Sequence, residues 1–192
     1  MKEDYIGAPD PTVPGSAYGE GKRSAEMLCT LFHRHYGLET QIARCFAFVG
    51  PLLPLDTHFA IGNFIRDALS GSAIRIDGDG TPTRSYLYAS DLVVWLWTLL
   101  FRAPSARAYN VGSAEELSIK ELAEVVAAST GAVSRITCER IVCPTAPKSH
   151  YVPNTTRAAQ ELGLISRVDL PTAIRKTMAW VSESNPAEIS IG

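Results

Sequence analysis

The sequence predicts a fold of the α/β class, in which strands and helices alternate along the chain. Two patterns carry this prediction. Apolar residues recur with the 3.6-residue spacing of a helix in several segments, and short segments rich in strand-forming residues lie between them. The chain has 192 residues, of which 46% are hydrophobic and 20% charged. It is therefore long enough to form one domain, or a large part of a bigger one, around a hydrophobic core.

The first half of the chain contains two helical patterns and three strand patterns. Small or apolar residues recur from Ala17 to Phe32, and Gly37 is a typical helix terminator. Gly50 and Pro51 end a segment that is dense in strand formers. The expected elements are, in order, a helix from Ala17 to about Gly37, a strand over residues 40–49, a proline-rich loop over 51–56, a helix over 58–70, and short strands over 73–77 and 83–88 on either side of a Gly-Asp-Gly turn.

The second half of the chain contains the longest apolar run, residues 92–101. A helix needs about twenty apolar residues to cross a bilayer, so this shorter run predicts a buried helix, with Ser90 and Asp91 as its N-terminal cap. Ser118 and Glu121 have the spacing of a capping box. The other expected elements are a strand over 109–111, a helix over 118–131, a strand over 135–142, a loop over 143–153, a helix over 155–162, and a last helix that starts near 169–171.

The charge balance excludes two classes of partner. Eighteen basic and twenty acidic side chains give a net charge of −2 without a basic stripe, so we expect neither nucleic acid nor a membrane surface as a partner.

The N-terminus lacks the apolar segment of a secretory signal, which predicts a cytoplasmic location. The cysteines form no CxxC pair and are expected to be small core residues in a reducing compartment: Cys29, Cys45, Cys138 and Cys143.

The histidines and cysteines do not predict a metal site. His33 and His35 are two residues apart on a helix and cannot face one ion. Cys138, Cys143 and His150 match no familiar zinc spacing, and a fourth ligand is not evident. We therefore expect no metal.

Tyr18, Lys22 and Glu26 are spaced four residues apart, which places them along one stripe of the first helix. A phenol ordinarily has a pKa of about 10, and an ammonium group one turn away favours the phenolate, so such a tyrosine can serve in general acid/base catalysis. It could take a proton from a sugar hydroxyl as hydride leaves the carbon. Chance is the alternative explanation, because seven Tyr and five Lys predict about 0.2 such pairs in this chain.

A series of motifs in a fixed order is far more specific than the Tyr-Lys pair alone. The motifs are Ser16-Ala-Tyr18-Gly-Glu-Gly-Lys22, Arg44-Cys-Phe46-Ala-Phe-Val-Gly50-Pro51, Ile76-Asp-Gly-Asp-Gly80, Arg84-Ser-Tyr-Leu-Tyr88 with Asp91, and Tyr109-Asn-Val-Gly-Ser113. Together they resemble the extended short-chain dehydrogenase/reductase family, specifically its NAD-dependent nucleotide-sugar epimerases and dehydratases. The resemblance runs from about Ser16 to Trp180.

The resemblance implies roles for particular residues. Tyr18 would be the acid/base at the sugar C4 hydroxyl, and Lys22 would hold the nicotinamide ribose of NAD and activate Tyr18. Phe46 would lie near the nicotinamide and complete the cofactor-binding set. Arg84 would clamp the diphosphate of the sugar nucleotide, a task that suits a planar, permanently charged guanidinium; the alternative is a surface arginine at the start of a strand. The other expected substrate-binding residues are Ala47, Asn63, Ile76 and Lys148.

Some features depart from the family pattern. The glycine-rich strand-turn-helix that receives the NAD pyrophosphate is absent from this sequence, as is the upstream Ser/Thr that bonds the substrate. Ala47 stands where the family usually has Asn, which removes one expected hydrogen bond. The second diphosphate-binding arginine is missing before the stretch Tyr151-Val-Pro-Asn154, where Lys148 or His150 is the candidate substitute.

The resemblance implies a partial Rossmann-like, doubly wound sheet joined to the smaller α/β sugar-nucleotide domain of the extended family. Residues 1–50 would be the C-terminal part of the dinucleotide-binding domain, and residues 51–192 mainly the substrate domain, with some segments returning to the sheet. The implied function is an NAD-dependent nucleotide-sugar epimerase or dehydratase that forms a 4-keto intermediate, here as a truncated chain. The alternative is a non-catalytic sugar-nucleotide-binding fragment or partner module.

A chain of this extent would leave one edge of its sheet and the apolar face of the Tyr18 helix without cover. The resemblance implies that this helix joins the helices of a second subunit in a homodimer of the full-length protein. We therefore expect the isolated chain to associate with itself.

Overall fold

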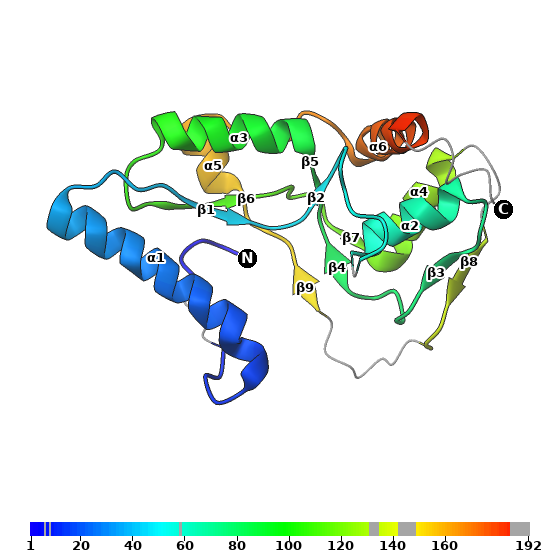
Figure 1. Ribbon diagram of the computed structural model, residues 1–192, viewed down its shortest axis with the longest axis horizontal. Helices are drawn as coiled ribbons and strands as arrows, with labels where there is room; N and C mark the ends of the chain where they lie inside the picture. Colours follow the sequence, from blue (N-terminus) through cyan, green and yellow to red (C-terminus); the bar gives the residue numbers. More distant parts are fainter. Residues whose placement is uncertain (6, 8, 58, 131–134, 142–148, 185–192) are drawn as a thin grey trace.

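The computed structural model describes residues 1–5, 7, 9–57, 59–130, 135–141 and 149–184. Helices and strands alternate along these residues, which confirms the predicted α/β class (Figure 1). A short 3-10 turn at Pro14–Ser16 leads into the first helix. The helices are α1 (Ala17–Tyr36), α2 (Ala60–Leu69), α3 (Ala89–Arg102), α4 (Ile119–Ser129), α5 (Thr156–Leu162) and α6 (Leu170–Ser184).

The strands of the described residues are short and pair in four small sheets. Three of the sheets are parallel pairs, which require crossover connections. These pairs are β1 (Ile42–Cys45) with β6 (Ala108–Val111), β2 (Phe48–Val49) with β5 (Leu87–Tyr88), and β3 (Ile74–Ile76) with β8 (Ile136–Cys138). In the fourth sheet, β4 (Thr83–Arg84) lies between an antiparallel β7 (Leu117–Ser118) and a parallel β9 (His150–Tyr151).

The ends of two helices follow the signals in the sequence. Gly37 ends α1 with a left-handed φ of 67°, a conformation that glycine adopts without a steric penalty. Ser118 and Glu121 form the predicted capping box of α4. The Ser118 hydroxyl accepts the Glu121 N–H at 3.1 Å, and the Glu121 carboxylate accepts the Ser118 N–H at 2.6 Å. Contacts within a few residues therefore determine where both helices end or begin.

Two predicted strands are interrupted, because the chain changes its pairing partner within each. The segment 40–49 divides into β1, which pairs with β6, and β2, which pairs with β5. At the break the Phe46 N–H donates to the Val111 carbonyl, and the Ala47 carbonyl accepts the Leu87 N–H, both at 3.0 Å. The segment 83–88 divides in the same way into β4 and β5. Phe46 and Ala47 thus lie at a junction between two sheets.

The sequence suggested that Asp91 caps α3, but the structure shows a different role for it. The helix begins at Ala89, and the carboxylate of Asp91, only 4% exposed, accepts the backbone N–H groups of Arg167 at 2.8 Å and Val168 at 3.1 Å. Asp91 therefore fixes the segment before α6.

The strands β7 and β9 were not predicted either, since two residues are too few to produce a periodic pattern.

The expectation that the cysteines are core residues is wrong for those that the structure describes. Cys45 and Cys138 are exposed and Cys29 is half-buried, while Cys143 lies outside the described residues. No three His, Cys, Asp or Glu side chains in the described part of the chain gather closely enough to hold a metal ion together.

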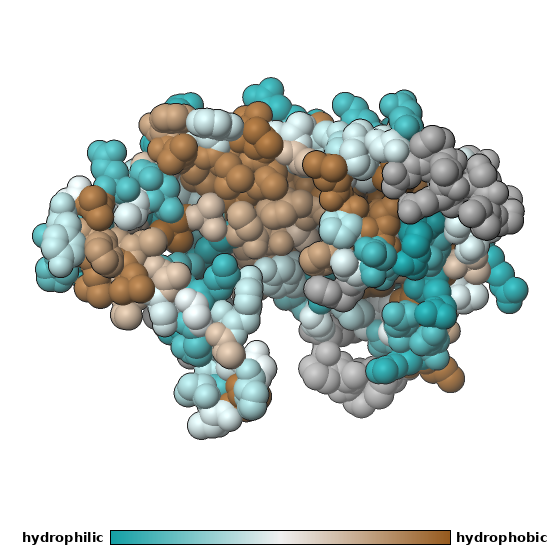
Figure 2. Space-filling model, in the orientation of Figure 1, coloured by the Kyte–Doolittle hydropathy of each residue, from teal (hydrophilic) through white to brown (hydrophobic). Residues whose placement is uncertain are grey.

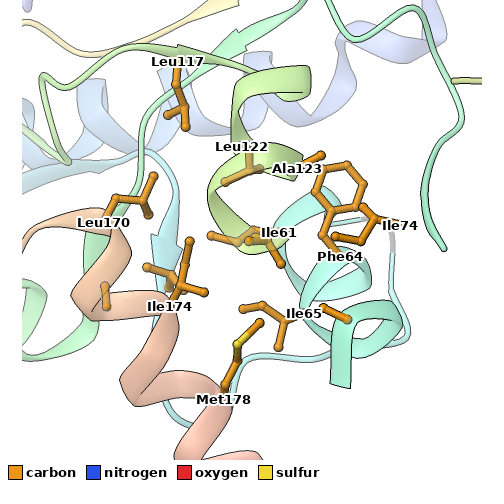
Figure 3. Close-up of a cluster of buried hydrophobic side chains, with 14 of the residues drawn as sticks. Ile61, Phe64, Ile65, Ile74, Leu117, Leu122, Ala123, Leu170, Ile174 and Met178 are labelled. Carbon is orange, nitrogen blue, oxygen red and sulfur yellow. The ribbon is translucent and has the colours of Figure 1, made fainter. Parts of the chain in front are cut away.

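Two hydrophobic clusters organise the fold. The larger packs α2, α4 and α6 against β3, with Ile65 and Ile74 fully buried (Figure 3). The second packs α3 and α5 against β5 and β6 around the buried Trp95. Val49 of β2 belongs to the first cluster and Leu87 of β5 to the second. The β2–β5 pair therefore joins the two clusters.

α3 is not the buried helix that its apolar run predicted. Trp95 and Leu99 face the second cluster, but the opposite face reaches solvent and forms much of the brown surface over α3 in Figure 2. Hydropathy cannot distinguish a core helix from one with an exposed apolar face, which is why the prediction failed. No helix in the described ranges is both long and apolar enough to span a membrane. The exposed apolar residues of α3 are Val93, Val94, Leu96, Trp97, Leu100 and Phe101.

α1 also lacks cover, as expected. None of its residues is buried, and Figure 1 shows it on the opposite side of β1 and β6 from α3. β1 pairs with β6 along one edge, and no other described strand pairs with it. The exposed apolar residues of α1 include Met27, Leu28, Leu31 and Phe32.

Candidate functional site

The predicted catalytic pair lies near the start of α1. Tyr18 is 77% exposed, and the ammonium group of Lys22 lies 5.4 Å from the centre of the Tyr18 ring. A cation at this distance from an aromatic face is attracted by the ring quadrupole. Helical spacing thus brings the phenol and the ammonium together on a surface that is open to a ligand.

Glu26, the third residue of this stripe, is held by Arg44 of β1. Its carboxylate accepts hydrogen bonds from Arg44 Nε at 2.8 Å and Nη2 at 2.7 Å. Arg44 Nη1 also donates to the carbonyl of Glu3 at 2.8 Å. The hydrogen bond with Glu26 raises the pKa of Arg44. The pair ties α1 to β1 and therefore positions Tyr18 and Lys22 relative to the end of that strand.

Phe46 and Tyr151 form an aromatic pair at the boundary of two cavities. Their ring centres lie 4.6 Å apart with an interplanar angle of 32°. The first cavity, about 730 Å³, lies between α1 and the strands β1 and β6, and Lys22 lines it. The second, about 560 Å³, is lined by Arg84 and by residues around β2 and α2. Both aromatic residues line both cavities, so a ligand could reach from Lys22 past the aromatic pair to Arg84.

Arg84 is the cation of the second cavity. Its Nη1 donates to the carbonyl of Thr83 at 2.7 Å and to that of Ser149 at 3.4 Å. Its guanidinium lies 5.8 Å from the centre of the Tyr151 ring. A half-buried guanidinium held in this way is suited to a phosphate or carboxylate ligand.

Electrostatic interactions link the residues around the two cavities. Partial burial raises the pKa of the Cys45 thiol, and the charge of Lys22 opposes this shift. Burial raises the pKa of Tyr151, Tyr18 adds to the increase, and Arg84 opposes it. The Arg84 guanidinium, 5.8 Å from the centre of the Tyr151 ring, is the nearby charge that the geometry shows.

Tyr86 is a neutral phenol in the wall of the second cavity. Burial raises the pKa of Tyr86 to about 12, and the nearby Arg84 opposes the shift. At neutral pH this side chain can therefore offer a hydroxyl group but no charge.

The other predicted substrate-binding residues lie in different places. Ala47 lines the second cavity. Asn63 lines a separate polar cavity of about 300 Å³, where its side-chain oxygen accepts Arg66 Nη1 at 3.3 Å. Ile76 is 2% exposed and packs in the larger hydrophobic cluster, so its side chain lines none of these three cavities.

The two candidates for the second diphosphate-binding group were Lys148 and His150, of which the structure describes only His150. Lys148 lies outside the described residues. His150 lies at the surface, with its Nε2 3.1 Å from the carboxylate of Glu116. Tyr151, which the sequence indicated only as part of a motif-like stretch, is the residue that contacts Arg84. The position of Tyr151 in that stretch was the one feature of the sequence that could have indicated a role in the site.

Asn110 is a further residue whose role the motif did not reveal. It is 2% exposed, and its Nδ2 donates to the carbonyls of Met1 and Asn154, both at 3.0 Å. Gly112 allows the close packing beside it, because a Cβ there would lie 2.9 Å from Pro153 Cγ and 3.2 Å from Phe46 Cβ. The Asn-Val-Gly sequence thus joins β6 to the segment after β9.

Solved structures share this fold over nearly the whole chain. UDP-glucose 4-epimerase from Thermotoga maritima, solved with UDP-glucose, matches with a TM-score of 0.83 and 23% identity, over 96% of this chain and 57% of that one. A dTDP-glucose 4,6-dehydratase from Streptomyces venezuelae, solved with NAD and TYD bound, matches with a TM-score of 0.74 and 23% identity, over 98% and 61%. These matches confirm the Rossmann-like α/β fold of the extended short-chain dehydrogenases/reductases.

Sequence comparison identifies the family. UDP-glucuronic acid decarboxylase 6 from Arabidopsis thaliana is 40% identical over 124 residues, which are 65% of this chain and 36% of that protein. UDP-glucuronic acid decarboxylase 1 from Danio rerio is 35% identical over 136 residues, 71% of this chain and 32% of that protein. The chain thus spans about a third of the length of these relatives. The model of the NAD dependent epimerase/dehydratase family matches residues 2–112, and the chain belongs to this family.

Proposed function

We propose that this chain forms the catalytic helix and the substrate-binding part of an enzyme that oxidises a nucleotide sugar at C4. The observation that carries the proposal is the placement of Lys22, the Phe46–Tyr151 pair and Arg84 along two adjoining cavities, with Tyr18 beside Lys22. A proton-transfer group and a permanent cation along one path suit a sugar linked to a diphosphate. The similarity to UDP-glucuronic acid decarboxylases and to a UDP-glucose epimerase supports this function.

Tyr18 is the proposed acid/base. Its exposed phenol would take the proton of the C4 hydroxyl and return it at the end of the reaction. The Lys22 ammonium, beside the ring, would stabilise the phenolate formed in that step and bind a ribose hydroxyl. A group positioned for proton transfer contributes a rate factor of roughly 10²–10⁴.

The family description implies NAD, which when bound would accept the hydride from C4. Lys22 and Phe46 line the first cavity. They suit the nicotinamide end of NAD, because they offer a cation for the ribose and an aromatic ring for the base. The pyrophosphate of such a cofactor ordinarily lies on a glycine-rich turn at a helix N-terminus, which this sequence does not contain. We therefore assign only the nicotinamide end to Tyr18, Lys22 and Phe46.

A UDP-sugar is the proposed substrate class. Arg84 would bind the diphosphate, and the second cavity, with apolar walls around β2 and α2, would take another part of the nucleotide sugar. The relatives are named as decarboxylases of UDP-glucuronic acid. These names favour uridine as the base and a hexuronic acid as the sugar. Roles for Ala47, Asn63, Ile76 and Lys148 in substrate binding stay predictions from the family resemblance.

Non-catalytic binding of a sugar nucleotide is the second candidate function. The cavity beside Arg84 supports it, because residues of this chain alone line that cavity. A chain with this function would bind a UDP-sugar but not NAD, either as a fragment or as a module that works with a partner.

Assembly, domain division and location are also proposals. The exposed apolar face of α1 supports a homodimer of the full-length protein through this helix. The division into residues 1–50 and 51–192 stays a prediction from the family resemblance, and the pairing of β1 with β6 supports the return of a later segment to the first part. The free cysteines of the described residues agree with a reducing compartment such as the cytoplasm.

Calorimetric titration of the 192-residue chain tests the proposal. The ligands are NAD and a panel of UDP-, dTDP-, CDP- and GDP-sugars at one salt concentration. We expect UDP-sugars to bind, Arg84→Ala to abolish that binding, and Arg102→Ala, which removes an exposed arginine of α3, to leave it unchanged. NAD binding would favour the enzyme over the non-catalytic module. Failure of every sugar nucleotide to bind would refute both functions.

A further inference from the structure

Tyr151 lies where three parts of the site meet. In the parallel register of β4 and β9, Arg84 pairs with Tyr151, so their side chains share one face of the sheet. One partner of the Tyr151 ring is the Arg84 guanidinium at 5.8 Å, and the other is the ring of Phe46 at 4.6 Å. The tyrosine therefore connects the cation of the second cavity to the aromatic residue at the junction of β1 and β2.

The hydrogen bonds of Arg84 leave one side of its guanidinium available. Nη1 is directed to the backbone by the carbonyls of Thr83 and Ser149. Nε and Nη2 make no hydrogen bond with another residue that the structure describes. Nε and Nη2 are the two donors that bind a phosphate or carboxylate side-on with two parallel hydrogen bonds.

The segment that carries Tyr151 is held firmly. Val152, the next residue, is 5% exposed, and the carbonyl of Asn154 accepts the Nδ2 donor of the buried Asn110. Gly112 admits Pro153 against the end of β6. A ring supported in this way can restrict the motion of a flexible arginine. The arginine then loses less conformational entropy when it binds a ligand.

We propose that Tyr151 is a positioning residue for Arg84, whose ring, not its hydroxyl, holds the guanidinium so that Nε and Nη2 meet a diphosphate. This inference rests on the proposed function, because it requires Arg84 to bind that group. The attraction between a guanidinium and an aromatic face keeps Arg84 over the ring, and the aromatic contact with Phe46 keeps the ring in place.

Calorimetric titration with UDP, and with uridine as the ligand without phosphates, tests the role of the ring. Tyr151→Phe keeps the ring and is expected to bind UDP within about twofold of the wild type. Tyr151→Leu is expected to weaken UDP binding about fivefold and to leave uridine binding unchanged. Tyr151→Met, which retains more of the volume, is the second variant without a ring and should behave like Tyr151→Leu. Thermal melting establishes that each variant is folded.

The outcomes separate this inference from the function on which it rests. If Arg84→Ala loses UDP binding but Tyr151→Leu and Tyr151→Met bind UDP like the wild type, the function stands and the positioning role is wrong. A Tyr151→Phe variant as weak as Tyr151→Leu would assign the role to the hydroxyl and overturn the inference. Equal loss of uridine binding would indicate a collapsed cavity and would also overturn it. A folded wild-type chain that binds no UDP would contradict both.

Discussion

Arg44 and Glu26 form a two-point ion pair between β1 and α1, with Nε–Oε1 and Nη2–Oε2 distances of 2.8 and 2.7 Å. About a third of each side chain is exposed, 33% for Arg44 and 31% for Glu26. Glu26 follows Lys22 by one helical turn, and Arg44 lies in the strand that leads to Phe46. The pair therefore determines where the proposed acid/base meets the aromatic residue of the cofactor site.

The first prediction concerns this ion pair. Arg44→Lys keeps the charge but loses the planar fork, so we expect the free energy of unfolding to fall by about 1 kcal/mol. Glu26→Gln should cost a similar amount, and the double variant should cost less than the sum because the two side chains act together. Urea denaturation measures these changes, with Arg102→Lys on α3 as the control. Unchanged stability in Arg44→Lys would show that the fork does not hold α1 to β1.

The second prediction concerns the space beside Gly112. Gly112→Ala is expected to lower the free energy of unfolding by about 1–3 kcal/mol, because Pro153 and Phe46 must move away from the new methyl group. Gly112 does not have a positive φ, so the cost comes from packing and not from backbone strain. Gly21→Ala is the matched control. Its Cβ would meet nothing within 4 Å inside α1, and it should stabilise the chain by about 0.5–1 kcal/mol. Equal effects of the two substitutions would contradict this packing.

The third prediction concerns the pH dependence of the α4 cap. The Ser118 backbone N–H bonds the carboxylate of Glu121 and lowers the pKa of Glu121 below its usual 4.5. The folded state then binds fewer protons than the unfolded state, so this contribution is present above about pH 4.5 and is lost as the pH falls through the lower folded value. Denaturation at pH 7 and at about pH 3.5 should show that Glu121→Gln loses less stability on acidification than the wild type. Glu124→Gln, an exposed carboxylate of the same helix, serves as the control. If Glu121→Gln lost as much stability on acidification as the wild type, the role of the cap would be contradicted.

The fourth prediction concerns the exposed face of α1. Sedimentation velocity should show that the wild-type chain associates with itself, because Leu28 and Phe32 are exposed one helical turn apart. Leu28→Glu and Phe32→Glu should shift the distribution towards monomer. Ile165→Glu, at an exposed apolar residue outside the helices, should not. A wild-type chain that sediments as a single monomeric species would contradict the proposed role of this face.

Local signals explain most of what the sequence predicted correctly. Gly37 and the Ser118–Glu121 pair determine helix ends through contacts within a few residues, and both signals were visible in the sequence. The same holds for Tyr18 and Lys22, because helical spacing alone places them together. These parts of the fold and of the site require no knowledge of the rest of the chain.

Contacts between distant segments explain what the sequence did not reveal. Tyr151 and Phe46 meet only because β9 joins β4 and because the chain changes sheets after Cys45. Asp91 resembles a helix cap in the sequence, yet its carboxylate binds the segment before α6. The apolar run of α3 predicted burial, but it could not indicate which face has a partner. Each of these features depends on tertiary pairing that no local pattern encodes.

Calorimetric titration with UDP-glucuronic acid determines whether Arg84 binds the diphosphate of a UDP-sugar. We expect measurable binding by the wild type that disappears in Arg84→Ala, while thermal melting shows both proteins to be folded. Binding of equal affinity in Arg84→Ala would show that Arg84 does not hold the diphosphate.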